Sequence, residues 1–166
     1  PFPRLTWHEA MNRFGSDKPD LRFGMEIRDI TELVKDCEFK VFADAAKKGY
    51  VKALTVEGGA KLTRKEIDDL TELAKVYGAK GLAYLTIEAE GPKSPIVKFF
   101  KPEELKTLIE ATEAKTGDII FFSADEKFAV VCNSLGYVRL ACGDRCKLRD
   151  PSKLALSWIT DFPLFE

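Results

Sequence analysis

The sequence predicts an α+β fold, an antiparallel sheet with helices packed on one face. Alternating apolar runs of strand length recur along the chain, and amphipathic runs with helix-capping residues follow them. Short segments rich in glycine and proline separate the strand-like runs, which favours hairpins over the long crossovers that parallel strands require. The order is strand, strand, helix, repeated once and followed by a further strand and a long helix, which is typical of an α+β sandwich.

The first element is a short helix followed by a charged loop. Residues 6–9 have the spacing of a capping box, and Gly15 stands where a left-handed residue would end the helix. The loop that begins there, GSDKPDLRF, packs four charged side chains around Pro19. Asp17 is expected to bond its own backbone in an Asx-turn, and Pro19 favours extended geometry in the residue before it. A turn explains the shape of this loop but not its density of charge.

The middle of the chain predicts the first strand–strand–helix unit. A short helix is expected over residues 30–35, followed by strands around residues 39–42 and over residues 50–56. A second capping box at residues 63–66 begins a helix whose apolar residues recur at helical spacing, and Gly78 is expected to end it.

The second unit repeats this order. Strands are expected over residues 82–87 and 96–100, with a turn over residues 91–95 between them. Pro102 suits the first turn of the next helix, which Gly117 is expected to end. The last predicted elements are a buried strand over residues 118–123 and a long helix from about residue 125 to residue 146.

Composition places the chain among folded domains. Its 166 residues suit one domain with appendages, and 45% apolar residues can form a real core. Because 26 basic residues nearly balance 27 acidic ones, overall charge favours neither a nucleic-acid-binding protein nor a disordered one. No apolar run approaches the ~18 residues of a membrane span, and no signal peptide is visible. We therefore expect a cytoplasmic protein without a membrane partner.

Cysteine and histidine spacing does not predict a metal site. Of four cysteines only Cys142 and Cys146 are close together, whereas a structural zinc site usually draws its ligands from two close pairs. An acid–base scheme built on histidine would depend on His8, the single histidine. The sequence contains no phosphate-binding loop, dinucleotide fingerprint or nucleophile elbow. We expect free thiols, and no metal, cofactor or catalytic residue within this chain.

The two ends of the sequence indicate an excised segment. The chain begins at Pro1 without an initiator methionine, and residues 158–166 form an apolar run that predicts a strand with nothing to pair with. An exposed apolar strand is an aggregation hazard that complete proteins avoid. We expect the chain to be a piece of a longer protein.

Charge is distributed unevenly along the chain. Between residues 40 and 65 there are seven basic residues against two acidic ones. Such a cluster can contact a phosphate backbone by displacing counterions, and it can equally be an ordinary solvated face. Both interpretations stay open for the candidate nucleic-acid contacts, which are Lys47, Lys48, Lys52, Lys61, Arg64 and Lys65.

Several motifs together resemble the bacterial-type aspartyl-tRNA synthetase family. The opening segment, with PRLT, EAM and GSDKPDLR, is similar to the region after the second class-defining motif of those enzymes. The middle of the chain, with GGA, LTRK, YGAKGLA, SPIVKF and GDIIFF, is similar to the domain inserted in them, called the GAD domain. The tail DFPLFE resembles the strand that re-enters the class II catalytic core. The resemblance covers nearly all of the chain.

The resemblance implies a domain organisation and a function. Residues 1–29 would be a flank from the catalytic core, residues 30–150 the GAD insertion domain, and residues 151–166 the return strand. The family uses ATP and Mg²⁺ to activate aspartate, transfers the aspartate to tRNA, and acts as a homodimer. The other catalytic motifs of the family lie outside this chain, so the chain alone is expected to be an inactive part of an aspartate–tRNA ligase.

The charged loop is the best site candidate under this resemblance. Its polar residues match a family signature beside the active-site cleft, and two roles stay open for them. They line the cleft, or they hold the insertion to the core by ion pairs. These residues are Ser16, Asp17, Lys18, Asp20 and Arg22.

A second class of function also stays open. GAD domains occur in subunits of the tRNA-dependent amidotransferase, where the module serves an assembly that amidates misacylated tRNA. The flanking motifs SDKPD and DFPLFE favour the synthetase. Two tRNA specificities stay open for the longer enzyme: it charges aspartate tRNA alone, or it charges asparagine tRNA as well. The sequence favours neither, because the anticodon-binding domain lies outside this chain.

Overall fold

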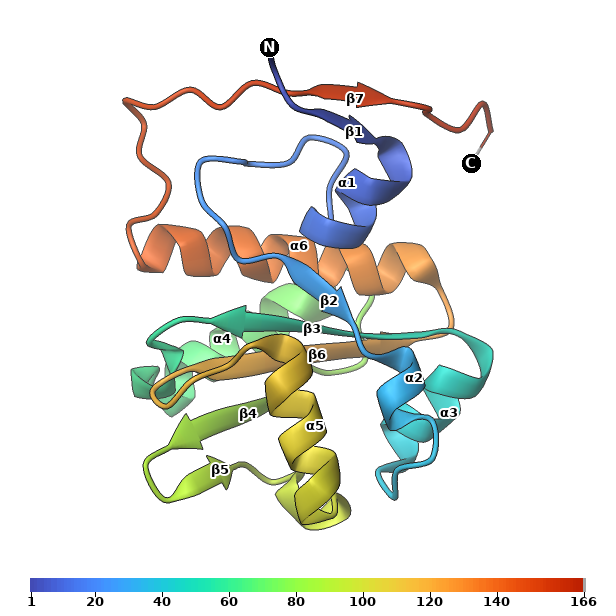
Figure 1. Cartoon of the computed structure of the whole chain (residues 1–166), viewed down its shortest axis with the longest axis vertical. Coiled ribbons are helices and arrows are strands. Elements are labelled where there is room, and N and C mark those ends of the chain that lie inside the picture. Colours follow the sequence, from blue (N-terminus) through green and yellow to red (C-terminus); the bar gives the residue numbers. More distant parts are fainter. Residues whose placement is uncertain (166) are drawn as a thin grey trace.

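A five-stranded sheet forms the centre of the molecule in the computed structural model, which describes residues 1–165. The strand order is β2-β3-β6-β4-β5, and every neighbouring pair is antiparallel. The predicted α+β class with an antiparallel sheet is therefore confirmed (Figure 1). The strands are β2 (Ile27–Asp29), β3 (Tyr50–Val56), β4 (Ala83–Glu88), β5 (Gly91–Lys93) and β6 (Ile119–Asp125).

Helices cover both faces of this sheet, so the prediction of helices on one face is wrong. Alternate residues of a strand point to opposite faces. In β6, Ile120 and Phe122 belong to one apolar core, and Ile119 and Phe121 belong to another. The first core is completed by α2 (Thr31–Val34), α3 (Lys40–Lys48) and α5 (Pro102–Thr112), and the second by α4 (Arg64–Val76) and α6 (Phe128–Arg145).

Two predicted strands are not strands. Residues 39–42 lead into α3, where the buried side chains of Phe42 and Ala45 lie on one helical face. The alanines that follow Phe42 favour helix, and this preference outweighs a short apolar run. Residues 96–100 contain the 3-10 turn η2 (Val97–Phe99), which follows a turn in which Ser94 accepts the N–H of Ile96.

The sheet contains β2 and β5 in place of the two predicted strands. β2 pairs with β3, so residues 27–29 belong to the sheet. β5 lies within the segment predicted as a turn and pairs with β4. The first unit is therefore β2, α2, α3, β3, α4, with two helices between its strands, and the second is β4, β5, η2, α5.

Most local signals are confirmed. β3 has the predicted bounds, and both capping boxes form, with Thr6 and Thr63 as their N-cap residues. Gly117 is one exception, because α5 ends at Thr112. Gly117 has a φ of 97° and forms a bulge just before β6 instead: its N–H donates to the carbonyl oxygen of Ile87, whose own N–H donates to the carbonyl oxygen of Asp118.

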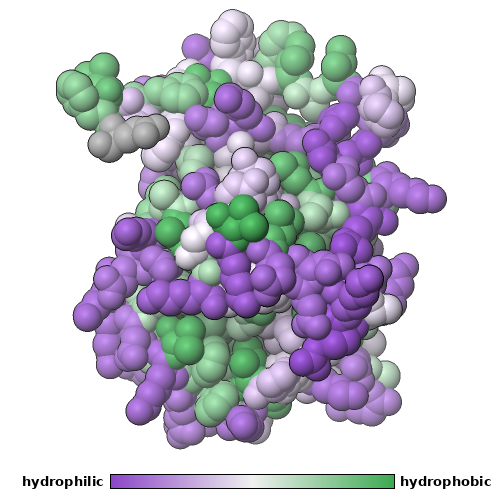
Figure 2. All heavy atoms as spheres, turned by 180° about the vertical axis from the view of Figure 1, so that it is seen from behind, coloured by the Kyte–Doolittle hydropathy of each residue, from purple (hydrophilic) through white to green (hydrophobic). Residues whose placement is uncertain are grey.

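A second, two-stranded sheet lies at one end of the molecule. It is formed by β1 (Arg4–Thr6) and β7 (Trp158–Thr160), which run parallel, so the prediction that the last strand has no partner is wrong. α1 (Trp7–Phe14) lies between this pair and α6 (Figure 1). Apolar side chains gather at this end of the surface (Figure 2), and Leu154, Trp158 and Leu164 are among the exposed ones. Within residues 1–165, no helix combines the length and apolar character of a membrane span.

Candidate functional site: the loop that joins the flank to the sheet domain

The charged loop begins where α1 touches α6. Gly15 ends α1 with a φ of 70°, and its N–H donates to the carbonyl oxygen of Met11 at 2.9 Å. A Cβ atom at Gly15 would lie 2.3 Å from the carbonyl oxygen of Cys132 and 2.6 Å from the Cα of Gly136. Glycine is therefore required twice at this position, once by the backbone angle and once by the lack of space.

Asp20 is the centre of an ion-pair network that ties the loop to the end of α6. Its carboxylate accepts hydrogen bonds from Arg22 at 2.9 and 2.7 Å and from Nε of Arg149 at 3.0 Å. Arg22 also donates to the carbonyl oxygen of Asp150 at 3.0 Å. The hydrogen bonds from Arg22, with a smaller contribution from Arg149, hold the pKa of Asp20 well below its usual range although partial burial opposes this shift. Asp20 and Arg22 therefore fix the loop in place.

Arg139 holds the same loop from α6. The side chain is buried, and the rings of Phe14 and Phe23 lie over its guanidinium, with centroids 4.9 and 4.1 Å from Cζ. Burial lowers the pKa of Arg139 to about 10, so the group is still charged at neutral pH. Its guanidinium donates, at distances between 2.8 and 3.1 Å, to the carbonyl oxygens of Asp20, Phe23, Gly24 and Met25.

Sequence reasoning missed Arg139, although a signal for it is present. It is the single charged residue between Lys127 and Asp144, in an otherwise apolar and uncharged helical run. A lone arginine in such a run is rarely buried without a partner, so it indicates an internal acceptor. Phe23 was missed for a different reason: its ring packs on Gly143, where a Cβ would lie 2.7 Å from the ring, and no spacing rule links the two residues.

The rest of the loop makes local turns or faces outward. Ser16 accepts the N–H of Lys18 at 3.0 Å, and Asp20 accepts the N–H of Arg22 at 3.1 Å. The predicted Asx-turn therefore forms at Asp20 and not at Asp17. Neither Asp17 nor Lys18 forms an ion pair with another residue in the range 1–165. The five predicted loop residues thus have three kinds of surroundings. Asp20 and Arg22 fix the loop, and Ser16 shapes its turn. Asp17 and Lys18 take no part in the ion pairs that hold it.

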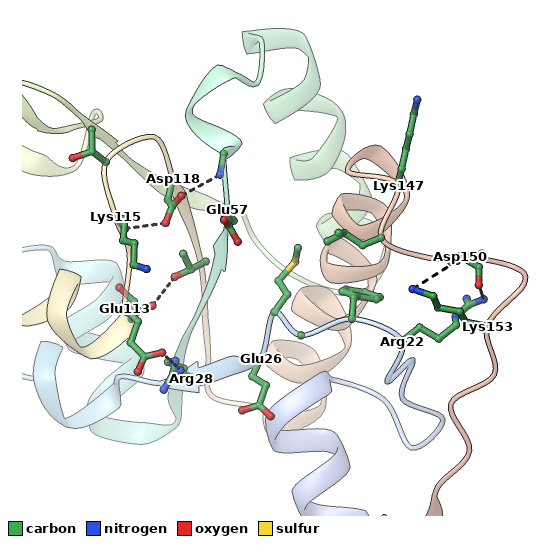
Figure 3. A pocket seen from close by; sticks show the side chains of 18 residues that line it. Arg22, Glu26, Arg28, Glu57, Glu113, Lys115, Asp118, Lys147, Asp150 and Lys153 are labelled. Atoms are coloured by element: carbon green, nitrogen blue, oxygen red, sulfur yellow. Dashed lines mark hydrogen bonds and ion pairs between the residues drawn. The ribbon is translucent and has the colours of Figure 1, made fainter.

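A charged cleft of about 890 Å³ lies beside the loop (Figure 3). Arg22 and Asp150 approach it from the α6 side, and Arg28 and Glu113 approach it from the sheet side, where they pair at 2.6 Å. The carboxylate of Asp118 already accepts hydrogen bonds from the backbone N–H groups of Gly58 and Lys115, at 3.0 and 2.8 Å. Basic and acidic side chains alternate around this cleft, so its charge favours neither an anion nor a cation.

The exposed basic candidates form two groups and not one surface. Lys47 and Lys48 form the first group, at the end of α3 and next to the start of β3. The second group lies beyond the end of β3. The strand between them has seven residues, which separates the groups by roughly 20 Å. The second group consists of Lys61, Arg64 and Lys65.

Lys52 is not a surface residue, so its prediction as a nucleic-acid contact is wrong. Its side chain is 0% exposed, and its ammonium group bonds to the side-chain oxygen of Asn12 and lies 3.5 Å from a carboxylate oxygen of Asp29. The ring of Phe128 lies over the same group, with its centroid at 5.3 Å. Charge counting along a sequence treats every lysine as solvated, and the packing of α1 on the sheet makes this one an exception.

The remaining candidates have structural surroundings. His8 stacks on Phe128, with ring centroids 5.3 Å apart. Cys37, Cys132 and Cys142 are buried, and burial raises the pKa of Cys132 to about 11 and that of Cys142 to about 12. In residues 1–165, no three side chains of the metal-binding types come together in one group.

Comparisons with known proteins match both the domain and its flanks. Residues 42–135 match the family model described as GAD domain. The whole chain is 54% identical over 167 residues to an aspartate–tRNA(Asp/Asn) ligase of Heliobacterium modesticaldum and 54% identical over 168 residues to one of Anoxybacillus flavithermus. It is 51% identical over 168 residues to an aspartate–tRNA ligase of Shouchella clausii. The chain spans 27% of the first relative and 28% of the other two.

The family match has a clear place in the structure. It begins within α3, contains every strand from β3 to β6, and ends within α6, so it includes most of both apolar cores. It covers more than half of the chain, and the resemblance inferred from the sequence motifs is confirmed. The chain therefore belongs to the GAD domain family.

Proposed function

We propose that this chain is the insertion domain of an aspartate–tRNA ligase, together with the segments that join it to the catalytic core. The observation that carries this proposal is the match over the whole chain, flanks included, to relatives named as aspartate–tRNA ligases. A module shared with an unrelated protein would match within residues 42–135 and lose similarity outside them. The same comparison favours the ligase over an amidotransferase subunit.

The proposed enzyme is a cytoplasmic class II synthetase that acts as a homodimer. It uses ATP and Mg²⁺ to form aspartyl-adenylate, and then transfers aspartate to tRNA. The structure suggests one change in the proposed domain limits. Because β2 is part of the main sheet, we place the start of the insertion at about residue 27 and keep its end near residue 150.

Aspartate-dependent ATP–pyrophosphate exchange tests this function. The longer protein that contains this chain is expected to catalyse the exchange, and the 166-residue chain alone is expected not to. Exchange by the isolated chain would contradict the view that the catalytic motifs lie elsewhere. Absence of exchange in the longer, folded protein would contradict the ligase assignment itself.

We further propose that the loop has both roles considered for it, divided between different residues. Asp20 and Arg22 hold the insertion to the core, and their bonds to each other and to the segment after α6 support this role. Ser16, Asp17 and Lys18 form the part beside the active-site cleft. In the longer protein, Asp17→Asn should change kcat or KM without changing the unfolding midpoint, whereas Asp20→Asn should lower the midpoint. Equal loss of stability in both variants would contradict this division.

The exposed basic residues are proposed as weak auxiliary contacts to tRNA. The excess of basic residues supports this, and separation into two groups implies two contacts with different parts of a phosphate backbone. Charge reversal at Lys47 and Lys48, or at Lys61 and Lys65, should weaken tRNA binding by the chain at low salt and reduce its salt dependence. Lys106→Glu, at an exposed lysine of α5, is the control. Binding that is undetectable at low salt, or unchanged by both double reversals, would contradict the proposal.

A further inference from the structure

A second hollow, quite different from the charged cleft, opens on the first face of the sheet. It is an apolar groove of about 430 Å³ between the start of α3, the start of β4 and the segment before η2. Phe39, Phe42 and Ile96, which belong to the first core or pack against it, contribute aromatic and aliphatic side chains to its walls. Val41, which also lines it, is 58% exposed. Apolar hollows with a few polar groups at fixed positions are the usual form of a ligand site.

The end of β6 lies in this groove without a neighbouring strand on one side. β3 follows β6 to its last residue, Asp125, whereas β4 pairs with β6 only as far as Phe122, which lies opposite Ala83. Ala124 is therefore beyond the reach of β4, and it lines the groove. This edge is a short stretch of strand that is paired on one side and open on the other.

The backbone polar groups of Ala124 point to the open side. The carbonyl oxygen of Asp118 accepts the N–H of Ile87, so the hydrogen-bonding groups of residue 118 face β4. These groups alternate in direction along an antiparallel strand, so those of residues 120, 122 and 124 face the same side. Within residues 1–165, β4 does not pair with β6 beyond Phe122, and neither the N–H nor the carbonyl oxygen of Ala124 bonds to the backbone of a loop or turn. An added strand would satisfy both groups.

The charge of the groove is also one-sided. Lys80 is the single charged residue in its lining, as far as residues 1–165 describe it, and its side chain is exposed. An exposed ammonium group at the edge of an apolar groove attracts a carboxylate and disfavours a cation. The charged cleft beside the loop, with its mixed signs, has no such preference.

We propose that this groove binds an extended peptide that adds to the edge of β6. One peptide residue pairs with Ala124, its apolar side chain enters the space between Phe39 and Ile96, and a neighbouring acidic residue lies against Lys80. The open backbone, the apolar walls and the single cation each specify a different part of the ligand, which is the pattern of peptide recognition by strand addition. The inference does not depend on the proposed ligase function.

The probe is a fluorescent capped peptide of sequence Gly-Val-Phe-Val-Asp-Gly, titrated with the full 166-residue chain and followed by anisotropy. We expect saturable binding in the range of roughly 10–100 µM. A peptide methylated on the phenylalanine nitrogen cannot pair with Ala124 and should bind about fivefold more weakly. A peptide with lysine in place of aspartate should also bind about fivefold more weakly, because it repels Lys80.

Variants of the chain test the same assignment from the protein side. Lys80→Glu should reverse the preference, so that the lysine peptide binds more tightly than the aspartate peptide. Val41→Asp should weaken binding of the aspartate peptide by about tenfold, because it places a carboxylate at the groove. The matched control is Val76→Asp, at a valine of α4 that is 75% exposed and outside the groove, and it should leave binding unchanged.

Several results would overturn the proposal. One is the absence of binding up to ~1 mM peptide with folded protein, and another is equal binding of the methylated and unmethylated peptides. Equal weakening by Val41→Asp and Val76→Asp would show that binding occurs elsewhere. Self-association of the chain that Val41→Asp abolishes, and that the peptide does not reverse, would assign the groove to a second copy.

Discussion

The loop at residues 15–25 and the groove at the end of β6 differ in how their backbone polar groups are satisfied. In the loop, four carbonyl oxygens converge on Arg139, and Asp20 is surrounded by donors. In the groove, the N–H and carbonyl oxygen of Ala124 lie beyond the last residue that β4 pairs with, beside an apolar wall. The comparison teaches that a dense cluster of charge can be structural when its members bond one another, whereas an inconspicuous alanine can mark a binding edge.

Replacing the buried arginine of the loop, Arg139, should cause the largest loss of stability. Arg139→Met keeps a long side chain but leaves the four carbonyl oxygens without their donor, and it should lower the free energy of unfolding by about 3–5 kcal/mol. Urea unfolding at neutral pH measures the loss. Arg64→Met, at an exposed arginine of α4, is the control and should cost less than about 0.5 kcal/mol. Similar losses in the two variants would mean that the loop does not depend on Arg139.

A pair of glycines separates backbone strain from close packing. Gly15 and Gly58 have φ angles of 70° and 69°, but an added Cβ atom would meet other atoms within 4 Å only at Gly15. Gly58→Ala should therefore cost about 1–2 kcal/mol, and Gly15→Ala about 3 kcal/mol or more, because α6 must also move. Thermal or urea unfolding of both variants gives the comparison. Equal losses would show that the contact between α1 and α6 adapts easily.

Asp20 should make the stability of the loop depend on pH. Its folded pKa is depressed, so its contribution is fully present above the unfolded value of about 3.9 and is lost as pH falls towards the folded pKa. Asp20→Asn should cost about 2 kcal/mol at pH 7, and the difference from the parent chain should shrink below about pH 4. Urea unfolding at several pH values tests this. A difference that stays constant down to pH 3 would exclude the carboxylate as its source.

A substitution in the groove should have the smallest effect on stability. Val41→Ser removes apolar surface that is already largely exposed, so the free energy of unfolding should change by less than about 0.5 kcal/mol. The same urea measurement applies. A loss of several kcal/mol would show that the groove is part of the core. It would then not differ from the loop, whose contacts stabilise the fold.

Local chemistry predicted the elements that depend on neighbours in sequence. The bounds of β3 follow from its alternation, and the two capping boxes from the spacing of threonine and glutamate. The segment after Phe39 was predicted wrongly because a short apolar run fits a strand as well as the start of a helix. Residues 119–122 could have corrected the layer arrangement, because four consecutive apolar side chains in a strand require cover on both faces.

The site was harder to predict because its contacts are distant in sequence. The loop was identified by its charge and by its resemblance to a family signature, but its partners Arg139 and Arg149 lie more than a hundred residues further along the chain. Lys52 was misassigned for the same reason, since its burial depends on α1 packing over β3. The open backbone of Ala124 leaves no trace in the sequence at all, because it depends on where β4 begins.

The parallel pairing of β1 with β7 limits how this domain can be removed. Arg4 lies opposite Trp158 and Thr6 opposite Thr160, so the end of β1 and the start of β7 are at opposite ends of the pair. A tight hairpin turn cannot join strands in this arrangement, because a parallel pair needs a crossover of about a dozen residues or more. A shortened protein that keeps both strands must therefore carry a replacement linker long enough to run back along them, and a simple deletion would separate the two strands.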